Sequence, residues 1–467
     1  MINVRNLNKN TLLVSLVIGL HFLWCGSAYL SWLYNVIEIV KINDINSNID
    51  MISEVFGYIF QVIGIFLICI YIKKAKPEFK KGRIAFMAIS IIHMLLIIPS
   101  ILTRSYEIAL ITGFLTNIFN GLETGYYLII ITEMVPSNQR GLSLGLGYSI
   151  GSVGSWLLSL CNSGNFLKST HIIIVYILLL FVTFSILMRI NSERAPKIKA
   201  TQSEAKPSLI ITLGITIFLL CFLKGIGFYF PMADITTGEV SLELSRAFYA
   251  IGLLIAGLIN DYKRQLGGIT CLAALAFPFI LLALRFSPKY SLYIWIMGYI
   301  FTGFYTVYRA LVFSDIADRN VSSLHLAPLG LMLGRLGDSL GAAIGVLLNS
   351  RPNILVIIGS LIFAITVFIG YFAFYRLYFQ TPDKPTDKNV NPMNHIVSFS
   401  ISYNLSARER EVLPLILTTK SNNEISKELY VSESTIKYHI RNILKKTGCI
   451  NRQELFKTYN EHLTHPQ

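Results

Sequence analysis

Charged residues are scarce in this chain of 467 residues. Asp, Glu, Lys and Arg together make up 14% of it, whereas hydrophobic residues make up 53%. A water-soluble domain rarely combines so little charge with so much Ile, Leu and Phe, so the composition excludes an ordinary soluble protein and predicts that most of the chain lies in a lipid bilayer. The net charge of +14 fits nucleic acid, lipid headgroups or cytoplasmic loops equally well, and only the positions of the charges decide between them.

Paired cysteines are absent as well. Five of the six cysteines lie in apolar runs and the sixth lies near the C-terminus: Cys25, Cys69, Cys161, Cys221, Cys271 and Cys449. No C-x-x-C spacing occurs, so the sequence supports neither a zinc ribbon nor a disulfide framework, and we predict no metal and no cofactor. The sequence also shows no phosphate-binding loop and no nucleophile–base pair, which argues against an enzyme.

Long apolar runs, by contrast, fill residues 1–379. A helix needs about 20 apolar residues to cross the hydrocarbon core of a bilayer. The first run is too long for the core of a signal peptide and lacks a small-x-small cleavage site, so we expect it to remain as a span. Twelve spans are predicted, at about 11–37, 52–72, 84–103, 107–134, 141–161, 170–189, 209–231, 244–260, 268–286, 290–313, 327–349 and 353–378.

The loops between these runs predict the orientation. Loops on the side of the N-terminus carry 17 Lys and Arg residues, whereas the alternate loops carry 7. Because Lys and Arg accumulate on the cytoplasmic side of membrane proteins, we expect a multi-pass protein of the inner (cytoplasmic) membrane with both termini in the cytoplasm.

Residues 405–467 follow a different pattern. The segment 380–404 before them is polar and contains Pro382, Pro385 and Pro392, so we predict a linker there. Three helix starts then show the capping-box spacing, in the pairs Ser406 and Glu409, Ser421 and Glu424, and Asn451 and Glu454. Ser432, followed by Glu433, is a natural N-cap for one more helix. The pattern predicts four short helices with a tight turn between the second and the third.

The helix after Ser432 is amphipathic. Its inner face carries Ile436, Ile440, Ile443 and Leu444, and its outer face carries Ser434, Tyr438, Arg441, Asn442 and Lys445, with Lys437 at the flank. Such a helix can lie in the major groove of double-stranded DNA, with its cations against phosphates and its forked donors against base edges. The charge pattern alone is more typical of a solvated surface helix.

The whole stretch resembles the LuxR/NarL-type helix-turn-helix domain. The family motifs T/S-x-R-E-R-E-V-L, E-I-A, S-x-x-T-V-K-x-H and N-R-x-E correspond to residues 406–413, 424–426, 432–439 and 451–454, within a match of about 50 of the 467 residues. Thr419 stands where the family has Gly, Thr447 stands where it has Leu, and Pro414 lies inside the first helix, where we expect a bend.

The LuxR/NarL resemblance also implies roles for individual residues. Lys437, Tyr438 and Arg441 fall where the family reads bases, and Ser432 and Thr435 fall where it touches the DNA backbone. The complete predicted DNA-binding set is Ser432, Ser434, Thr435, Lys437, Tyr438, Arg441 and Lys445. The resemblance further implies a homodimer that packs through the last helix, around Leu455, Phe456 and Tyr459.

The apolar part resembles the major facilitator superfamily. The polar, basic loop 191–208 divides the spans into two halves of six, at about 11–190 and 209–379. Gly257-x-x-x-Asp261, followed by Lys263 and Arg264, looks like the loop motif of that family, whereas residues 73–83 in the first half keep only its basic part. The glycines in 141–154 also look family-like, although plain helix packing explains them equally well. The predicted fold class is therefore all-α, a twelve-helix transmembrane bundle over 1–379 with a small four-helix domain over 405–467.

The resemblance places spans 1, 4, 7 and 10 around a central cavity. Charges inside spans are costly and usually face a cavity or a partner. The candidate ligand residues are His21, Trp24, Glu123, Tyr127, Lys224, Tyr229 and Arg309. Glu123 and Lys224 belong to opposite halves, so a direct pair would bridge the cavity. Arg335 and Asp338 either contribute to the site or merely neutralise each other. An aromatic-walled cavity with a few charges suits a small amphipathic or aromatic ligand.

Two functions fit this sequence. The first is a membrane-bound one-component transcription regulator, in which a transporter-like sensor binds an unidentified small molecule and controls a cytoplasmic DNA-binding domain. The second is a secondary transporter that carries a regulatory DNA-binding tail. The incomplete loop motif of the first half favours the sensor.

Overall fold

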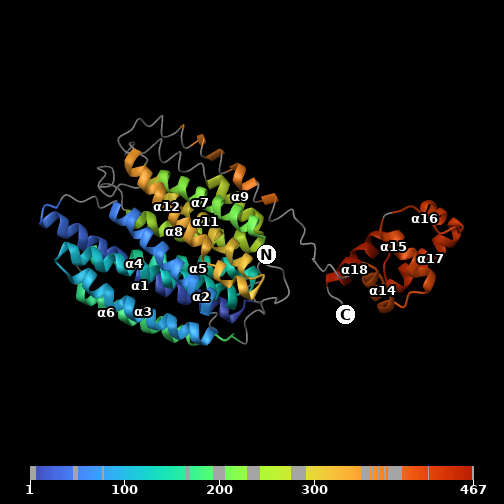
Figure 1. Cartoon of the computed structure of the whole chain (residues 1–467), viewed down its shortest axis with the longest axis horizontal. Helices are drawn as coiled ribbons and strands as arrows, with labels where there is room; N and C mark the ends of the chain where they lie inside the picture. The colour runs from blue at the N-terminus through green and yellow to red at the C-terminus, as the bar shows by residue number, and fades with distance from the viewer. Residues whose placement is uncertain are drawn as a thin grey trace. The chain divides into compact units, whose positions relative to one another are not determined.

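The computed structural model describes residues 7–45, 51–75, 78–163, 169–192, 206–228, 242–274, 291–348, 392–418 and 420–464, together with parts of 358–376. The chain forms two compact units, which we call the bundle (Met1–Pro382) and the C-terminal domain (Asp383–Gln467). Both units are helical, and the described residues include no strand (Figure 1). The predicted all-α fold class is confirmed.

The described helices of the bundle overlap the predicted spans. Residues 275–286 of the ninth span and most of the twelfth span, 353–378, lie outside the described residues. Blue-to-teal helices form one half of the bundle and green-to-orange helices form the other (Figure 1). The helices are α1 (Lys9–Ile42), α2 (Gly57–Ala75), α3 (Phe79–Leu102), α4 (Tyr106–Met134), α5 (Arg140–Ser163), α6 (Ser169–Leu187), α7 (Pro207–Phe228), α8 (Leu242–Tyr262), α9 (Arg264–Ala274), α11 (Ser291–Ala317) and α12 (Leu329–Leu348), with the short turns η2 (Met51–Phe56), η3 (Ser137–Gln139) and η7 (Val321–Leu326).

The outer surface of the bundle is apolar. Among the described residues, six helices are long and apolar enough to cross a membrane: α1, α2, α3, α6, α7 and α11. Large side chains such as Leu95, Phe181 and Ile211 point outward and are 60% exposed or more. A surface of this kind is stable where lipid rather than water is the solvent. The bundle is thus the membrane part of the chain.

Glycines let the two halves approach each other along α5 and α8. A Cβ atom on Gly145 would lie 2.5 Å from the carbonyl oxygen of Leu253, and one on Gly257 would lie 2.4 Å from that of Gly141. Only a residue without a side chain fits at these positions. Close packing, the alternative left open for the glycines of 141–154, therefore accounts for Gly141 and Gly145.

The C-terminal domain has a hydrophobic core of its own. Its helices are α14 (Pro392–Ser402), α15 (Ala407–Leu417), α16 (Asn422–Glu428), α17 (Glu433–Thr447) and α18 (Arg452–Thr464). Residues from all five contribute to one buried cluster, which includes Phe399, Leu413, Ile425, Ile436 and Leu455. We therefore expect this domain to fold in isolation.

The predicted linker 380–404 is partly wrong, because α14 occupies 392–402. Pro392 is the first residue of α14, a position where proline is favoured because its missing N–H has no helical partner there. Phe399 is fully buried and packs edge-on against Tyr459 of α18, with ring centroids 5.1 Å apart. The prolines suggested a flexible segment, whereas a single buried aromatic side chain secures this helix to the domain.

Local capping signals, in contrast, predicted the helix starts correctly. Ser406 with Glu409 and Ser421 with Glu424 form complete capping boxes, and the Ser432 hydroxyl accepts from the Thr435 N–H. The third pair is a partial box, because Asn451 accepts from the Glu454 N–H while the Glu454 carboxylate accepts from Ile450 N.

The helix ends and the residues that depart from the family pattern are also accommodated. α17 stops at Gly448, whose φ of 73° lies in the left-handed region that glycine adopts without strain. α15 runs through Pro414, and the Thr447 hydroxyl donates to the Ile443 carbonyl at 2.9 Å. Thr419 lies outside the described residues.

One ion pair between a buried carboxylate and a partly exposed lysine makes the stability of this domain depend on pH. Glu409 is 3% exposed and accepts from the Ser406 N–H and from Lys446 Nζ, each at 2.7 Å. Burial raises the pKa of this carboxyl, but the bonds from Lys446 and Ser406 outweigh burial and hold the pKa below its usual value. The ionised form is therefore the one that stabilises the fold.

We expect the isolated domain to lose part of its stability in acid. The folded pKa of Glu409 lies below the unfolded value of about 4.3, so its contribution is complete above the unfolded pKa and is lost as the pH falls through the folded pKa. Glu409→Gln should lower the free energy of unfolding near neutral pH by about 1–3 kcal/mol and weaken this acid dependence. Urea unfolding across the acid range measures both effects. Glu411→Gln is the matched control, since its pair with Arg408 is exposed, and equal curves for the two variants would contradict the prediction.

Candidate functional site

In the C-terminal domain, α17 turns its polar face to solvent. Ile436, Ile440 and Ile443 are buried in the core, so the opposite face takes no part in the packing of the domain. Of the residues predicted to bind DNA, Thr435 is half-buried and the others are exposed: Ser432, Ser434, Lys437, Tyr438, Arg441 and Lys445. The structure thus brings the whole predicted set onto one accessible face of α17 and the turn before it.

The cations of this face remain available to a partner. Lys437 forms an ion pair with Glu433 at 2.9 Å, but both side chains are exposed, and an exposed pair of this kind contributes less than about 1 kcal/mol. Tyr438 is 62% exposed, an unusual position for a ring unless a partner covers it. The face therefore offers charge, hydrogen-bond donors and an aromatic surface at helical spacing.

Arg452 supports this face, a role that the sequence did not reveal. Its guanidinium donates to the Lys420 carbonyl at 2.7 Å and to the Asn422 side chain. The start of α18 is thereby joined to the start of α16, the helix that comes before the turn into α17. The N-R-x-E motif marked the position of Arg452, but only the folded chain shows what it touches.

The predicted dimer residues of α18 are not all accessible. Leu455 is fully buried, and Tyr459 is half-buried against Phe399 of the same domain, whereas Phe456 is 47% exposed. The prediction is wrong for Leu455 because it ignored α14, which together with α15 and α17 makes α18 part of the core.

The bundle contains a large central cavity between its halves. Its empty volume is about 1500 Å³, including space open to solvent, and its lining comes from α1, α2, α4, α5, α7, α8, α11 and α12. Among the predicted ligand residues, His21, Tyr127, Lys224 and Arg309 line it. Trp24 does not, because it is fully buried against the ring of His21. Tyr229 lies outside the described residues.

The charges of the cavity gather in the second half. Asp338 forms ion pairs with Lys224 at 2.7 Å and with Arg309 at 2.8 Å, and Arg335 lies over the ring of Tyr58 at 4.6 Å. Three cations therefore line the cavity with one carboxylate, Asp338. The neutralisation considered for Arg335 and Asp338 is not what the structure shows, since Asp338 pairs with Lys224 and Arg309 instead.

Glu123 does not pair with Lys224, so the predicted bridge across the cavity is wrong. The Glu123 carboxylate is fully buried, and its Oε2 lies 2.8 Å from His21 Nε2 and 2.6 Å from His93 Nδ1. All three residues belong to the first half. The sequence could not reveal this, because the pairing depends on how α1, α3 and α4 pack.

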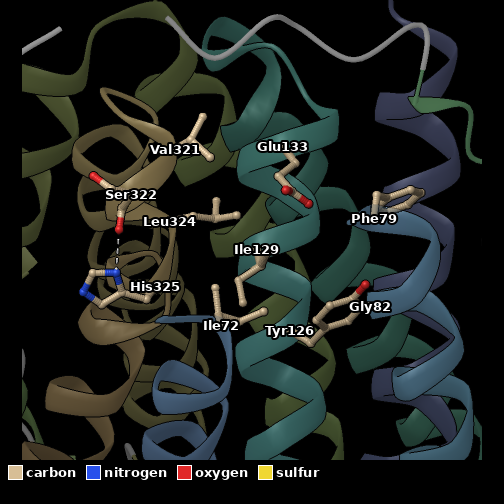
Figure 2. Close-up of a pocket in the computed structure, with 10 residues that line it drawn as sticks. All are labelled: Ile72, Phe79, Gly82, Tyr126, Ile129, Glu133, Val321, Ser322, Leu324 and His325. Carbon is tan, nitrogen blue, oxygen red and sulfur yellow. Dashed lines mark hydrogen bonds between the residues drawn. The ribbon is translucent and has the colours of Figure 1, made fainter. Parts of the chain in front are cut away.

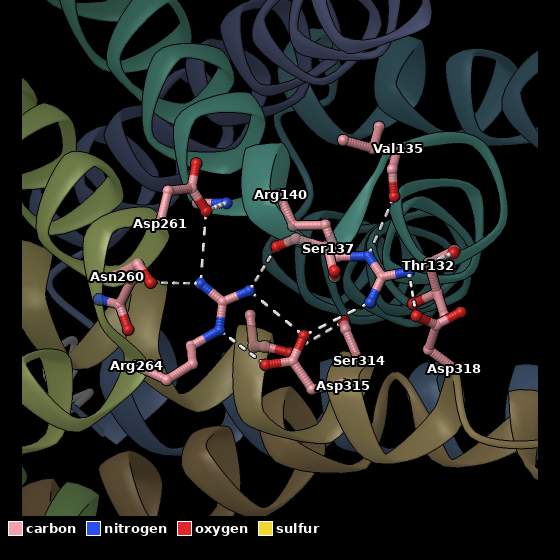
Figure 3. A network of polar contacts seen from close by, with 12 residues as sticks. Thr132, Val135, Ser137, Arg140, Asn260, Asp261, Arg264, Ser314, Asp315 and Asp318 are labelled. Atoms are coloured by element: carbon pink, nitrogen blue, oxygen red, sulfur yellow. Dashed lines mark hydrogen bonds and ion pairs between the residues drawn. The ribbon is translucent and has the colours of Figure 1, made fainter. Parts of the chain in front are cut away.

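At one end of the cavity, a network of ion pairs joins the two halves (Figure 3). Arg264, at the start of α9, bonds to Asp315 of α11 at 2.6 Å and to the Ser137 carbonyl of the first half at 2.8 Å. Arg140, at the start of α5, is fully buried and reaches Asp315 at 3.4 Å and Asp318 at 3.0 Å.

Asp261, predicted from the loop motif, completes the network. Its carboxylate accepts from the N–H groups of Gly141 and Leu142 at 2.7 and 2.6 Å, so it caps the N-terminus of α5 across the interface between the halves. We call Arg140, Asp261, Arg264, Asp315 and Asp318 the latch. The sequence indicated Asp261 and Arg264 but missed Asp315 and Asp318, which follow a long apolar run and resemble ordinary loop charges.

A smaller pocket lies between α2, α3, α4 and η7, with an empty volume of about 480 Å³ (Figure 2). Its wall is mostly apolar, with the Glu133 carboxylate and the Tyr126 hydroxyl on one side. Opposite them, the His325 ring bonds to the Ser322 carbonyl at 2.9 Å within η7. None of the predicted ligand residues lies there.

The fold and the exposed face define a class for each unit. Residues 403–458 match the family of bacterial regulatory proteins, luxR family. The C-terminal domain is a LuxR-type helix-turn-helix domain, as the sequence predicted. The bundle shares its fold with a solved transporter.

Particular relatives agree with this assignment. The chain is 39% identical over 59 residues to the CsgBAC operon transcriptional regulatory protein of Escherichia coli (strain K12), covering 13% of this chain and 27% of that protein. It is 50% identical over 50 residues to the HTH-type transcriptional regulator MalT of Yersinia pestis (strain Pestoides F), covering 11% and 6%. The chain thus spans about a quarter or less of the length of the curated relatives it matches.

The bundle is similar to a solved transporter. The human organic anion transporter MFSD10 (TETRAN) superposes with a TM-score of 0.56 at 12% sequence identity, covering 79% of this chain and 100% of that one. At this identity the likeness shows the fold alone. The comparisons indicate a regulator domain and a transporter-like fold, and none of them points to an enzyme family.

Proposed function

We propose that this chain is a membrane-bound one-component transcription regulator, in which the bundle binds a small ligand and the LuxR-type domain binds double-stranded DNA. The observation that carries the proposal is the presence in one chain of a charged cavity and of a DNA-binding domain whose reading face is exposed. A regulator needs both parts, whereas transport by itself uses only the cavity.

The ligand is a small organic anion. Lys224, Arg309 and Arg335 exceed Asp338 in charge, and desolvated cations favour a carboxylate or a phosphate over a neutral solute. Tyrosines such as Tyr127 supply an apolar and aromatic wall for the body of the ligand.

The ligand acts by changing the balance between two packings of the halves. A ligand shifts such an equilibrium only by its differential affinity for the two states. The latch joins the halves at one end of the cavity, so it must break when the halves separate at that end. A coupling of about 1–3 kcal/mol would change promoter occupancy by about 5–150-fold.

The protein lies in the inner membrane with both termini in the cytoplasm, where DNA is accessible. The excess of basic residues in the loops on the N-terminal side supports this orientation. Alkaline phosphatase fused after Gln467 should be inactive, since the enzyme needs export, and β-galactosidase at the same place should be active. The opposite pattern of activities would contradict the orientation.

The second candidate is a secondary transporter with a regulatory tail. The latch favours it, because a contact that joins two halves at one end of a cavity is what alternating access requires.

Two measurements on the full chain separate these functions. Genome-wide transcript levels are compared in cells grown with and without a panel of small carboxylates. Uptake of the same carboxylates is measured in membrane vesicles that contain the protein. A regulator should give carboxylate-dependent transcripts that disappear with Arg441→Ala and with Lys224→Met, without uptake. Uptake that Lys224→Met abolishes, together with transcripts that ignore Arg441→Ala, would identify a transporter and overturn the proposal.

A further inference from the structure

A second group of polar side chains lies beside the central cavity, in the first half of the bundle. His21 and Cys25 are one turn apart on α1, His93 comes from α3, and Glu123 comes from α4. All four are buried, and their ligand-type atoms lie within 4.8 Å of one another. Helices from three places in the sequence thus converge on one point.

Hydrogen bonding within the group does not account for all of its members. His21 and His93 both bond to the same oxygen of Glu123, at 2.8 and 2.6 Å. The other oxygen, Oε1, is buried without a hydrogen-bond partner in the part of the chain that the structure describes. A buried carboxylate oxygen without a partner costs about 1–3 kcal/mol or more, so a cation that binds to this atom would remove that cost.

We infer that His21, Cys25, His93 and Glu123 form a binding site for one transition-metal ion of the zinc type. Two imidazoles, a thiolate and a carboxylate are the donors that zinc takes, in tetrahedral arrangement. Bonds of about 2.0–2.3 Å separate tetrahedral donors by roughly 3.4 Å. The nitrogen and oxygen atoms now bonded to each other need to move apart by less than about 1 Å to hold the ion.

The charges of the four side chains also favour a divalent ion such as Zn²⁺. The Glu123 carboxylate and the Cys25 thiolate together carry two negative charges, which neutralise Zn²⁺ and leave a site without net charge. A neutral complex is the form that a membrane interior tolerates, because an uncompensated ion there is costly. On binding, Cys25 releases its thiol proton to water. Each imidazole stays neutral but transfers its proton from the nitrogen that now donates to Glu123 to its other ring nitrogen, which frees the first nitrogen to bind the ion.

The surroundings fix the ligands and give the ion a route. The His21 ring lies edge-on between Trp24 and Tyr127, with centroids 4.7 and 4.6 Å away, and His93 lies 5.4 Å from Trp24. Rings packed this closely restrict the rotamers of both histidines. His21 and Cys25 also line the cavity, so an ion in the cavity meets these two ligands first. The site is independent of the sensor function proposed above, because it concerns binding by the bundle alone.

The experiment uses the purified full-length protein in detergent, stripped of metal with a chelator. After incubation with Zn²⁺ and gel filtration, the wild type should retain one zinc per chain. With Co²⁺ it should show a near-ultraviolet thiolate-to-cobalt charge-transfer band. Cys25→Ser, which changes one atom, should abolish this band and weaken Zn²⁺ binding by at least about 10–100-fold, the loss that even an outer-shell partner causes.

Matched controls separate this site from other histidines and cysteines. Cys271→Ser alters a buried cysteine of the second half, and His325→Gln alters a histidine of η7, so both should bind like the wild type. Glu123→Gln and His93→Gln should lose the ion. If size-exclusion chromatography shows that Glu123→Gln or His93→Gln is misfolded, the comparison of Cys25→Ser with the wild type decides whether the site binds zinc. No retained zinc, no thiolate band, or equal binding by Cys25→Ser and Cys271→Ser would each overturn the proposal.

Discussion

Replacing Lys437 and Arg441 together with alanine is expected to abolish specific DNA binding by the isolated C-terminal domain. Both side chains are exposed on the polar face of α17, and neither contributes to the core. A residue that reads a base contributes about 1–3 kcal/mol, or about 5–150-fold in affinity, with relaxed specificity at one position. The double variant should therefore lose about 2–6 kcal/mol if the two effects add.

Fluorescence anisotropy with a promoter fragment, at fixed salt, measures this loss. The single variants distinguish roles, because a base-reading residue relaxes specificity at one position whereas a phosphate contact weakens all sequences evenly. Lys457→Ala is the matched control, since it removes one exposed charge from α18. If both single variants bind like the wild type, the reading face lies elsewhere on the domain.

Neutralising Asp315 should produce the largest effect in the bundle. Asp315 accepts from Arg264 at 2.6 Å and pairs with Arg140 at 3.4 Å, and Arg140 is fully buried. Asp315 and Arg264 are partly exposed and Arg140 keeps its pair with Asp318 at 3.0 Å, so we expect the loss of the charged hydrogen bonds to cost about 1–3 kcal/mol. Asp315→Asn should therefore shift the bundle toward the state in which the latch is broken.

The rate at which a maleimide labels the Ser149→Cys variant measures this shift. Ser149 is buried between α5 and α8, where its hydroxyl donates to the Ala250 carbonyl at 2.8 Å. We expect Asp315→Asn to raise its rate of labelling by a maleimide about 5–150-fold, the factor that corresponds to about 1–3 kcal/mol. Glu38→Gln is the control, since its pair with Arg104 is exposed. Equal labelling in the two backgrounds would mean that the latch does not hold the halves together.

The sequence by itself determined the order of elements and the class of each part. Apolar runs long enough for a bilayer predicted the helices of the bundle, because the need to satisfy the backbone in lipid leaves a chain little choice. The helix starts of the C-terminal domain followed from pairs such as Ser406 and Glu409, because a cap acts within one turn. The polar face of α17 followed from helical periodicity in the same way.

Only the tertiary structure decided the partners of the buried groups. Glu123 lies with His21 and His93 rather than with Lys224, and Asp338 lies with Lys224 and Arg309. Leu455 is buried because the other helices of its domain cover it. A charge or an apolar side chain in a helix carries no local mark of its partner, since that partner comes from a helix that is distant in sequence. Capping and periodicity act within a few residues and can be read from the chain, whereas pairing depends on the three-dimensional packing of helices.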